Sequence, residues 1–253
     1  VERSRGLGDV YKRQIQRDIR NYVLSNIGPD DAAKMTADTL SHLSAEDMKY
    51  IPAEALAHID ASKMAAAQLT FLSSEQMQAI YGLHVQTHDF GTGFDFTLNR
   101  RPELFGTLSA PLPQGAFLAI MVDDEQIGFA TLSEDRLRWT FNPSLDLYTT
   151  SNALSVAVST PEMSSLQPGE PLNIDIRSVA MLSTSEIGQL PADYLSKVDA
   201  GSFDGLTVEQ LKALTVAQLT AMSNEQKLHA FSPSIDSLFS NGHQSTSLQV
   251  SAD

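Results

Sequence analysis

The chain has no cysteine among its 253 residues, which excludes disulfide staples, thiol catalysis and zinc sites built from cysteine. The lack of cysteine does not mark the compartment, because many secreted bacterial proteins also lack it. No apolar run is long enough to span a bilayer, so we expect no membrane insertion. Positive charge is scarce, with 17 basic against 31 acidic residues and a net charge of -14. Such a surface repels nucleic acid and anionic membranes, so we expect no nucleic-acid partner.

The first residues are the one basic stretch of the chain. Asp9 to Gln14 resemble the in-frame translation of a transposase adapter used to prepare sequencing libraries. We therefore expect residues 1–14 to be a non-native, adapter-derived segment; a genuine basic N-terminal arm is the alternative. Without their four basic and two acidic residues, 13 basic and 29 acidic residues remain, a net charge of -16. On this interpretation the chain is a fragment of a longer protein, and its true termini lie elsewhere.

An eight-residue repeat is the clearest pattern that is present. Repeats with apolar residues at their fifth and eighth places begin at Ser183, Pro191, Asp199, Thr207, Thr215 and Ser223. A looser copy begins at Thr36, Ser44, Pro52 and Asp60 and resumes at Ser73 after five extra residues, 68–72. Five repeats, those at Ser73, Ser183, Thr207, Thr215 and Ser223, carry a capping box, Ser/Thr-x-x-Glu/Gln, in which both side chains satisfy free amides at a helix start. Each repeat is therefore predicted to open a new helix.

One continuous helix does not tolerate this period, because eight residues at 3.6 per turn rotate the apolar pair by about 80°. Pro52 and Pro191, at repeat starts, also exclude a helix interior there. We predict two α-solenoids of helices about two turns long, which persist only by stacking their apolar pairs. A plain helical bundle with chance spacing is the alternative. In the last repeat Lys227 takes the first apolar place, and Leu228 and Phe231 fall one position late, as expected of a terminal cap.

Between the two arrays the apolar period changes to two. The alternating stretches lie at 94–98, 118–122, 137–141, 154–158 and 172–176, with turn material between them. Alternation of this kind is typical of strands with one buried face. Several such strands within about 90 residues predict a β-sandwich, with Trp139 at the centre of its core.

The motifs of this middle segment follow one another in a particular order. They are Gly106-Thr107-Leu108, Leu112-Pro113-x-Gly115, Leu118 to Val122, Ile127-Gly128-x-Ala130, Leu137-x-Trp139-x-Phe141 and Leu172-Asn173-Ile174-Asp175. This order resembles the bacterial Ig-like domains that are tandemly repeated in giant surface adhesins. The stretch 146–152 departs from the family pattern, because it lacks the usual Asp-Gly before the next strand. The octads, in turn, resemble the Leu-Thr-x-x-Gln-x-x-Leu repeats of large, secreted, acidic bacterial proteins of adhesin or RTX type.

Few residues suggest chemistry. Asp123, Asp124 and Glu125 could ligate calcium through oxygen, and the resemblance implies calcium at domain junctions; a plain hairpin turn is the alternative, because no Asp-x-Asp-x-Asp-Gly loop is present. His84 and His88 have the spacing of two metal ligands on a helical turn, but without a zincin glutamate we expect a solvated pair. No Gly-x-Ser-x-Gly elbow supports a hydrolase. We therefore predict no enzyme, and no cofactor other than this calcium.

The expected organisation has five parts: the segment 1–14, N-terminal octad helices over 15–87, an Ig-like β-sandwich over 88–178, C-terminal octad helices over 179–233, and a tail or next module over 234–253. The predicted function is a structural and adhesive segment of a large secreted or cell-surface bacterial protein, acting as spacer and presentation module in cell adhesion or biofilm. Expected partners are neighbouring modules of the same polypeptide and host-surface or matrix glycans or proteins. The alternative is a glycan- or protein-binding sandwich. Against it, Trp139, Phe141, Phe94 and Phe96 fall on predicted buried faces.

Overall fold

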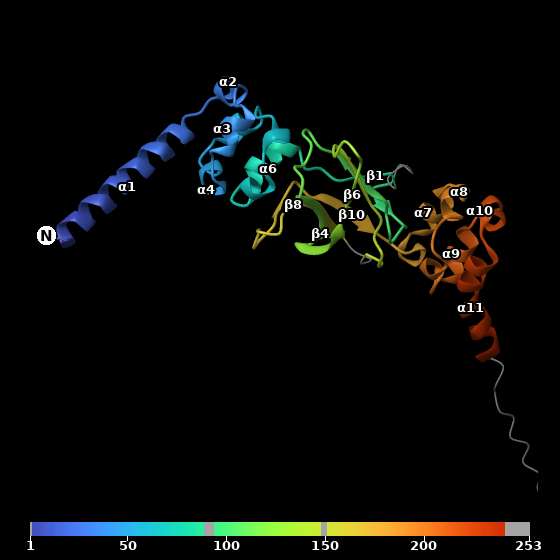
Figure 1. Ribbon diagram of the computed structural model, residues 1–253. Coiled ribbons are helices and arrows are strands. Elements are labelled where there is room, and N and C mark those ends of the chain that lie inside the picture. The colour runs from blue at the N-terminus through green and yellow to red at the C-terminus, as the bar shows by residue number, and fades with distance from the viewer. Residues whose placement is uncertain (1, 89–93, 148–150, 241–253) are drawn as a thin grey trace, which may run out of the picture. The chain divides into compact units, whose positions relative to one another are not determined.

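The computed structural model describes residues 2–88, 94–147 and 151–240, and Figure 1 shows their helices and strands, many of them labelled. The chain combines helices with two β-sheets, as the sequence predicts at this coarse level. It divides into two compact units. Unit 1 holds Val1–His88, Glu103–Ser144 and Asn152–Asn173, and unit 2 holds Asp89–Pro102, Leu145–Ser151 and Ile174–Asp253. The five expected parts and the four boundaries between them stay predictions.

Unit 1 opens with helices, nearly all of them short. They are α1 (Glu2–Ser25), α2 (Pro29–Ala32), α3 (Ala37–Ser41), α4 (Ala45–Met48), α5 (Ala53–Leu56), the 3-10 turns η1 (Ala61–Lys63) and η2 (Ala66–Leu69), and α6 (Ser74–Tyr81). We call residues 28–82 the N-terminal helical segment. The predicted starts at Thr36, Ser44, Pro52, Asp60 and Ser73 are all N-cap residues. The helix starts expected from the sequence are therefore confirmed at these positions.

One predicted boundary in this segment is wrong. A helical turn, η2, begins after Ala65, so the pattern resumes at Ala65 and not at Ser73. The short repeat is Asp60–Met64, with five residues, and residues 68–72 are not an insertion. Gln68 Oε1 accepts a hydrogen bond from the Ala65 amide at 2.9 Å. Alanine has no side-chain acceptor, so only half of a capping box forms, and the Ser/Thr-x-x-Gln pattern did not reveal it.

The strands form two sheets. Their bounds are β1 (Gln86–Thr87), β2 (Phe96–Thr97), β3 (Leu104–Thr107), β4 (Phe117–Val122), β5 (Glu125–Phe129), β6 (Thr131–Leu132), β7 (Arg138–Phe141), β8 (Ser151–Ser159), β9 (Gln167–Pro168) and β10 (Leu172–Ile176). One sheet has the order β1-β3-β7-β6 and the other the order β2-β10-β8-β4-β5, with β9 paired to β8. The β2–β10 pair is parallel, whereas β4 pairs antiparallel with both β5 and β8.

The predicted alternation places the expected side chains inside. In the β4–β8 register Leu118, Ile120 and Val122 stand opposite Val158, Val156 and Leu154, and all six are buried. Trp139 is buried as well, and it pairs across strands with Gly106. A Cβ on Gly106 would lie 2.7 Å from the indole Nε1, so this glycine makes room for the ring. Phe96 is likewise buried, whereas Phe94 and Phe141 are only partly buried.

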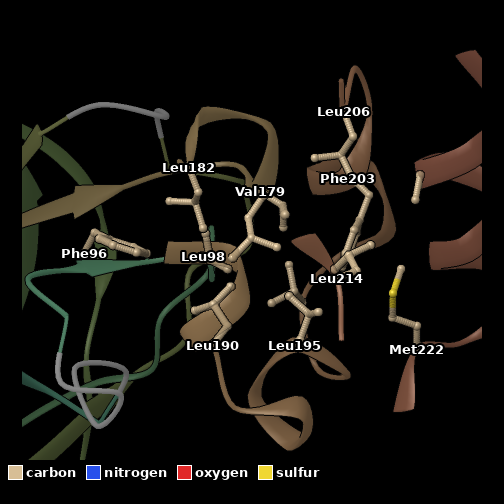
Figure 2. Close-up of a cluster of buried hydrophobic side chains, with 13 residues drawn as sticks. Phe96, Leu98, Val179, Leu182, Leu190, Leu195, Phe203, Leu206, Leu214 and Met222 are labelled. Atoms are coloured by element: carbon tan, nitrogen blue, oxygen red, sulfur yellow. The ribbon is translucent and has the colours of Figure 1, made fainter. Parts of the chain in front are cut away.

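Unit 2 contains the second set of repeats. Its helical elements are η3 (Val179–Met181), α7 (Thr184–Gln189), α8 (Ala192–Leu195), η4 (Ala200–Phe203), α9 (Val208–Ala213), α10 (Val216–Ala221) and α11 (Asn224–Ser240). We call residues 178–232 the C-terminal helical segment. Helices three repeats apart pack together, as α7 packs with α9 and α8 with α10. Figure 2 shows the resulting core, a row of buried side chains that runs from Phe96 and Leu98 to Met222.

The last repeat differs from the expectation of a shifted pattern. Ala230, at the eighth place, is fully buried, so the apolar register is kept. Leu228 is 64% exposed and does not replace Lys227 in the core. The sequence pattern misplaced Leu228 because leucine at a helix surface and leucine in a core look alike along the chain. Among the described residues, no helix is both long and apolar enough to cross a membrane.

Candidate functional site

Five buried glutamines each connect the start of one short helix to the end of an earlier helix in the same helical segment. These bridging glutamines are Gln68, Gln76, Gln210, Gln218 and Gln226, each at the fourth place of its repeat. The Oε1 atom of Gln218 accepts from the Thr215 amide at 2.8 Å, which caps its own helix. Its Nε2 donates to the carbonyls of Ile187 at 2.7 Å and Leu190 at 2.8 Å. One amide therefore satisfies a helix start and donates to two carbonyls near the end of an earlier helix.

The sequence separations follow one rule at four of the five glutamines, whereas Gln210 reaches back 30 and 28 residues, to Ala180 and Leu182. In the C-terminal segment Gln218 reaches back 31 and 28 residues, to the fifth and eighth places of the repeat four before its own. Gln226 reaches back by the same 31 and 28 residues. In the N-terminal segment the separations are 28 and 25 for Gln68, and the same two for Gln76. The difference of three equals the three residues by which the repeat Asp60–Met64 is short. Both segments therefore make the same contact although one repeat of the N-terminal segment is three residues shorter.

A carboxylate takes the fourth place in one early repeat of each helical segment. Asp47, in the Ser44 repeat, accepts from Arg20 Nε at 2.8 Å and Arg20 Nη2 at 2.7 Å. It also accepts from the Ser44 amide at 2.8 Å and from the Ser44 hydroxyl. Burial alone would raise the pKa of Asp47, but these hydrogen bonds outweigh burial and hold the pKa below its usual value.

Glu186, in the Ser183 repeat, occupies the equivalent place. Its carboxylate accepts from the Ser183 amide at 2.7 Å and from Arg177 Nη1 at 3.3 Å. The bond from Ser183 is the main cause of a lowered pKa for Glu186. Arg177 also pairs with Asp175 at 2.8 Å and lies over the Phe96 ring. The fourth place of a repeat is thus an acid where its distant partner is an arginine, and a glutamine where its distant partners are two backbone carbonyls.

Within unit 1, the last two repeats of the N-terminal segment contact the strands. Ser74, at the second place of its repeat, donates its hydroxyl to the Pro168 carbonyl at 2.6 Å. Gln78, at the sixth place, lies against Gly169, where a Cβ would come within 3.0 Å of Gln78 Oε1. Ala66, at the second place of the preceding repeat, lies 3.7 Å from the position of a Cβ on Gly115. The side chains at the second and sixth places of these two repeats therefore form the contact with the strands.

Tyr81 and Arg136 also hold the junction between the N-terminal helical segment and the strands. The Ser109 amide donates to the Tyr81 carbonyl at 2.8 Å, and α6 ends at Gly82 in the left-handed conformation, φ 58°. Tyr81 is buried, which raises the pKa of its hydroxyl, and that hydroxyl has no hydrogen-bond partner among the described residues. Arg136 donates to the carbonyls of Leu112, Pro113 and Ala116, and so holds the loop that carries Gly115.

The predicted calcium ligands lie at a hairpin turn. Asp123 and Asp124 have φ of 48° and 68°, between the paired residues Val122 and Glu125, the signature of a tight two-residue hairpin. Asp123 Oδ1 accepts from the Ala153 amide at 2.9 Å. Among the described residues, no group of three His, Cys, Asp or Glu side chains could hold a metal ion. Calcium binding by Asp123, Asp124 and Glu125 stays a prediction that this geometry does not strengthen.

The two histidines are held separately. His84 Nε2 lies 3.1 Å from Gln78 Nε2, and His84 Nδ1 lies 4.0 Å from a Glu170 oxygen. His88 stacks on Phe105 with ring centroids 4.2 Å apart. Strand β1 lies between the two residues, so they do not share one helical turn.

An apolar patch on the outer side of the second sheet was not foreseen. Ala119, Met121 and Ala157 form a small buried cluster with Leu166, on the faces of β4 and β8 opposite the main core. The rings of Phe117 and Phe129, both about half exposed, lie nearby on β4 and β5 with centroids 5.7 Å apart. The alternating pattern had assigned this face to solvent. Phenylalanine at the outward places was the signal that could have revealed it.

Comparisons with protein-family models, with curated proteins and with solved structures find no significant match to this chain.

Proposed function

We propose that the two helical segments are short α-solenoids, that the two sheets form an Ig-like β-sandwich, and that the chain is a structural, adhesive segment of a large secreted or cell-surface bacterial protein. The bridging glutamines are the observation that carries this proposal. They repeat one kind of contact through two separate segments, with hydrogen-bond distances of 2.6 to 2.8 Å at the shortest contact of each. Repetition of one contact produces a stack of defined pitch, which suits a spacer.

The role would be mechanical: modules in series set the reach of the polypeptide, and the net charge of -14 keeps a long chain soluble. The test is to pull a single chain between handles at residues 15 and 240. We expect at least two force-resisting unfolding steps, because the chain has two compact units. Extension without any resisting step would remove the spacer role. The uninterrupted gene provides a second test, in which further octads and Ig-like copies are expected beside this segment.

The second candidate is a glycan- or protein-binding β-sandwich, and the pair Phe117 and Phe129 favours it. Exposed aromatic rings provide flat apolar faces on which sugar rings stack. A glycan array probed with the wild-type chain tests this function, with the variant Phe117→Ala/Phe129→Ala as the paired sample. Binding that disappears in the variant would support recognition through this patch. Binding that survives would place recognition elsewhere.

A further inference from the structure

The second place of the repeats carries small or polar residues, with two exceptions. The small or polar ones are Ala37, Ala45, Ala53, Ala61, Ala66, Ser74, Thr184, Ala192, Ala200 and Asn224. The exceptions are Val208, which is 51% exposed, and Val216, which is 82% exposed. Leu228, at the sixth place of the last repeat, is 64% exposed. Three large apolar side chains thus face solvent on the glutamine-bearing repeats of one helical segment.

The other helical segment shows what covers these places. In its glutamine-bearing repeats, Ala66 and Ser74 at the second place and Gln78 at the sixth contact Gly115, Pro168 and Gly169 of the strands. In the C-terminal segment Val216, Asn224 and Leu228 occupy the same places in its last two repeats. Tyr81 follows Ser73 at the same distance as Phe231 follows Ser223, although α6 ends after Tyr81 and α11 continues to Ser240. Tyr81 is buried at the strand junction, whereas Phe231 is only partly buried.

We propose that Val216, Asn224 and Leu228 form a docking surface for a further β-sandwich module that follows in the same polypeptide. This inference rests on the proposed spacer function and adds to it how successive modules are joined. The partner surface is a proline-glycine pair at the end of a strand, like Pro168-Gly169, with a carbonyl that can accept from a side chain and no side chain on the glycine. Asn224 can donate to that carbonyl as Ser74 does. Val216 and Leu228 replace the smaller Ala66 and the polar Gln78, so docking would remove more apolar area from water here.

The test uses an extended chain in which a second copy of residues 82–253 follows Phe231 directly. This join keeps the spacing from the cap to the strands and restores Gly82 after the helix. Since the chain has no cysteine, Val216→Cys or Leu228→Cys in the first copy introduces the only thiol. We expect maleimide to label either thiol at least tenfold more slowly in the extended chain than in the chain of normal length. Met181→Cys, at a residue that is 54% exposed near the first repeats of the segment, should label equally fast in both.

Equal labelling of residue 228 in the two chains would overturn the proposal, whether the added module folds without docking or does not fold. Slower labelling of the normal chain as its concentration rises would identify a second copy as the occupant, which also overturns it. Neither outcome contradicts the proposed spacer function, because that function is tested separately, by the force measurement on the chain without an extension. The substitutions are at exposed positions, so loss of the fold is not expected to obscure the result.

Discussion

A side-chain amide differs from a carboxylate by one property that decides the bridging contact: it donates. Gln218 meets two carbonyl oxygens, to which only a donor can bind, whereas Asp47 and Glu186 meet arginine guanidinium groups. Glutamine and glutamate fit the capping box equally well, because only the acceptor oxygen is used there. The choice between them is therefore set by the second contact, which comes from a distant part of the chain.

Replacement of this donor gives the first prediction. Gln218→Glu places a carboxylate against the Ile187 and Leu190 carbonyls, and we expect it to lower the free energy of unfolding by about 2 to 3 kcal/mol at pH 7. Burial and the two carbonyls raise the pKa of the new acid above its unfolded value of about 4.3, so the loss should grow with rising pH and nearly vanish near pH 4. Urea unfolding followed by circular dichroism measures it. The control is Gln189→Glu, at an exposed residue of α7. Equal losses in the two variants would contradict the bridging role.

The carboxylate of Asp47 gives the opposite pH dependence. Its pKa is lowered in the folded chain, so its contribution to stability is present above the unfolded pKa of about 3.9 and is lost as pH falls through the folded value. We expect Asp47→Asn to cost about 1 kcal/mol at pH 7 and almost nothing at pH 2. Melting curves across this range provide the measurement. Asp38→Asn, in the exposed first turn of α3, is the control and should change little at either pH. A pH-independent loss for Asp47→Asn would refute the role of the charge.

At the scale of the element, helix starts could be predicted because a capping box is local. Ser73, Thr207 and Thr215 each meet their partner three residues later, and the structure places an N-cap at each. The start at Ala65 was missed because only the glutamine half of the box is present. The bridges could not be read in the same way, because their partners lie 25 to 31 residues away. The exposed ring of Phe129 was missed because a period of two does not tell which face is covered.

A substitution in the hairpin turn at Asp123-Asp124 tests both the stability of the turn and the predicted binding of calcium. Asp124 has φ of 68°, a conformation that glycine adopts without strain, so Asp124→Gly should raise the melting temperature by a few degrees. Differential scanning calorimetry in calcium and in chelator separates the two roles. If Asp124 only makes the turn, the gain is the same in both solutions. A calcium-dependent rise in the wild-type melting temperature that Asp124→Gly abolishes would show that the predicted ligand is real.

At the scale of the whole molecule, the two units differ in the spectroscopic signals that report their unfolding. Trp139, the single tryptophan, belongs to unit 1, as does the N-terminal helical segment with Gln76. The C-terminal helical segment with Gln218 belongs to unit 2, and its core is a separate row of buried side chains. Tryptophan fluorescence therefore follows unit 1, whereas circular dichroism follows helices of both units.

This arrangement predicts that equivalent substitutions in the two segments act on different units. Gln218→Glu should lower the midpoint of part of the circular dichroism transition in urea and leave the fluorescence midpoint unchanged. Gln76→Glu removes a bridge beside the junction of α6 with the strands, where Ser74 bonds to Pro168, so it should lower the fluorescence midpoint as well. The two variants introduce the same chemical change, and each is the control for the other. If both shift fluorescence and circular dichroism together by the same amount, the chain unfolds as one cooperative body and the modules do not act independently.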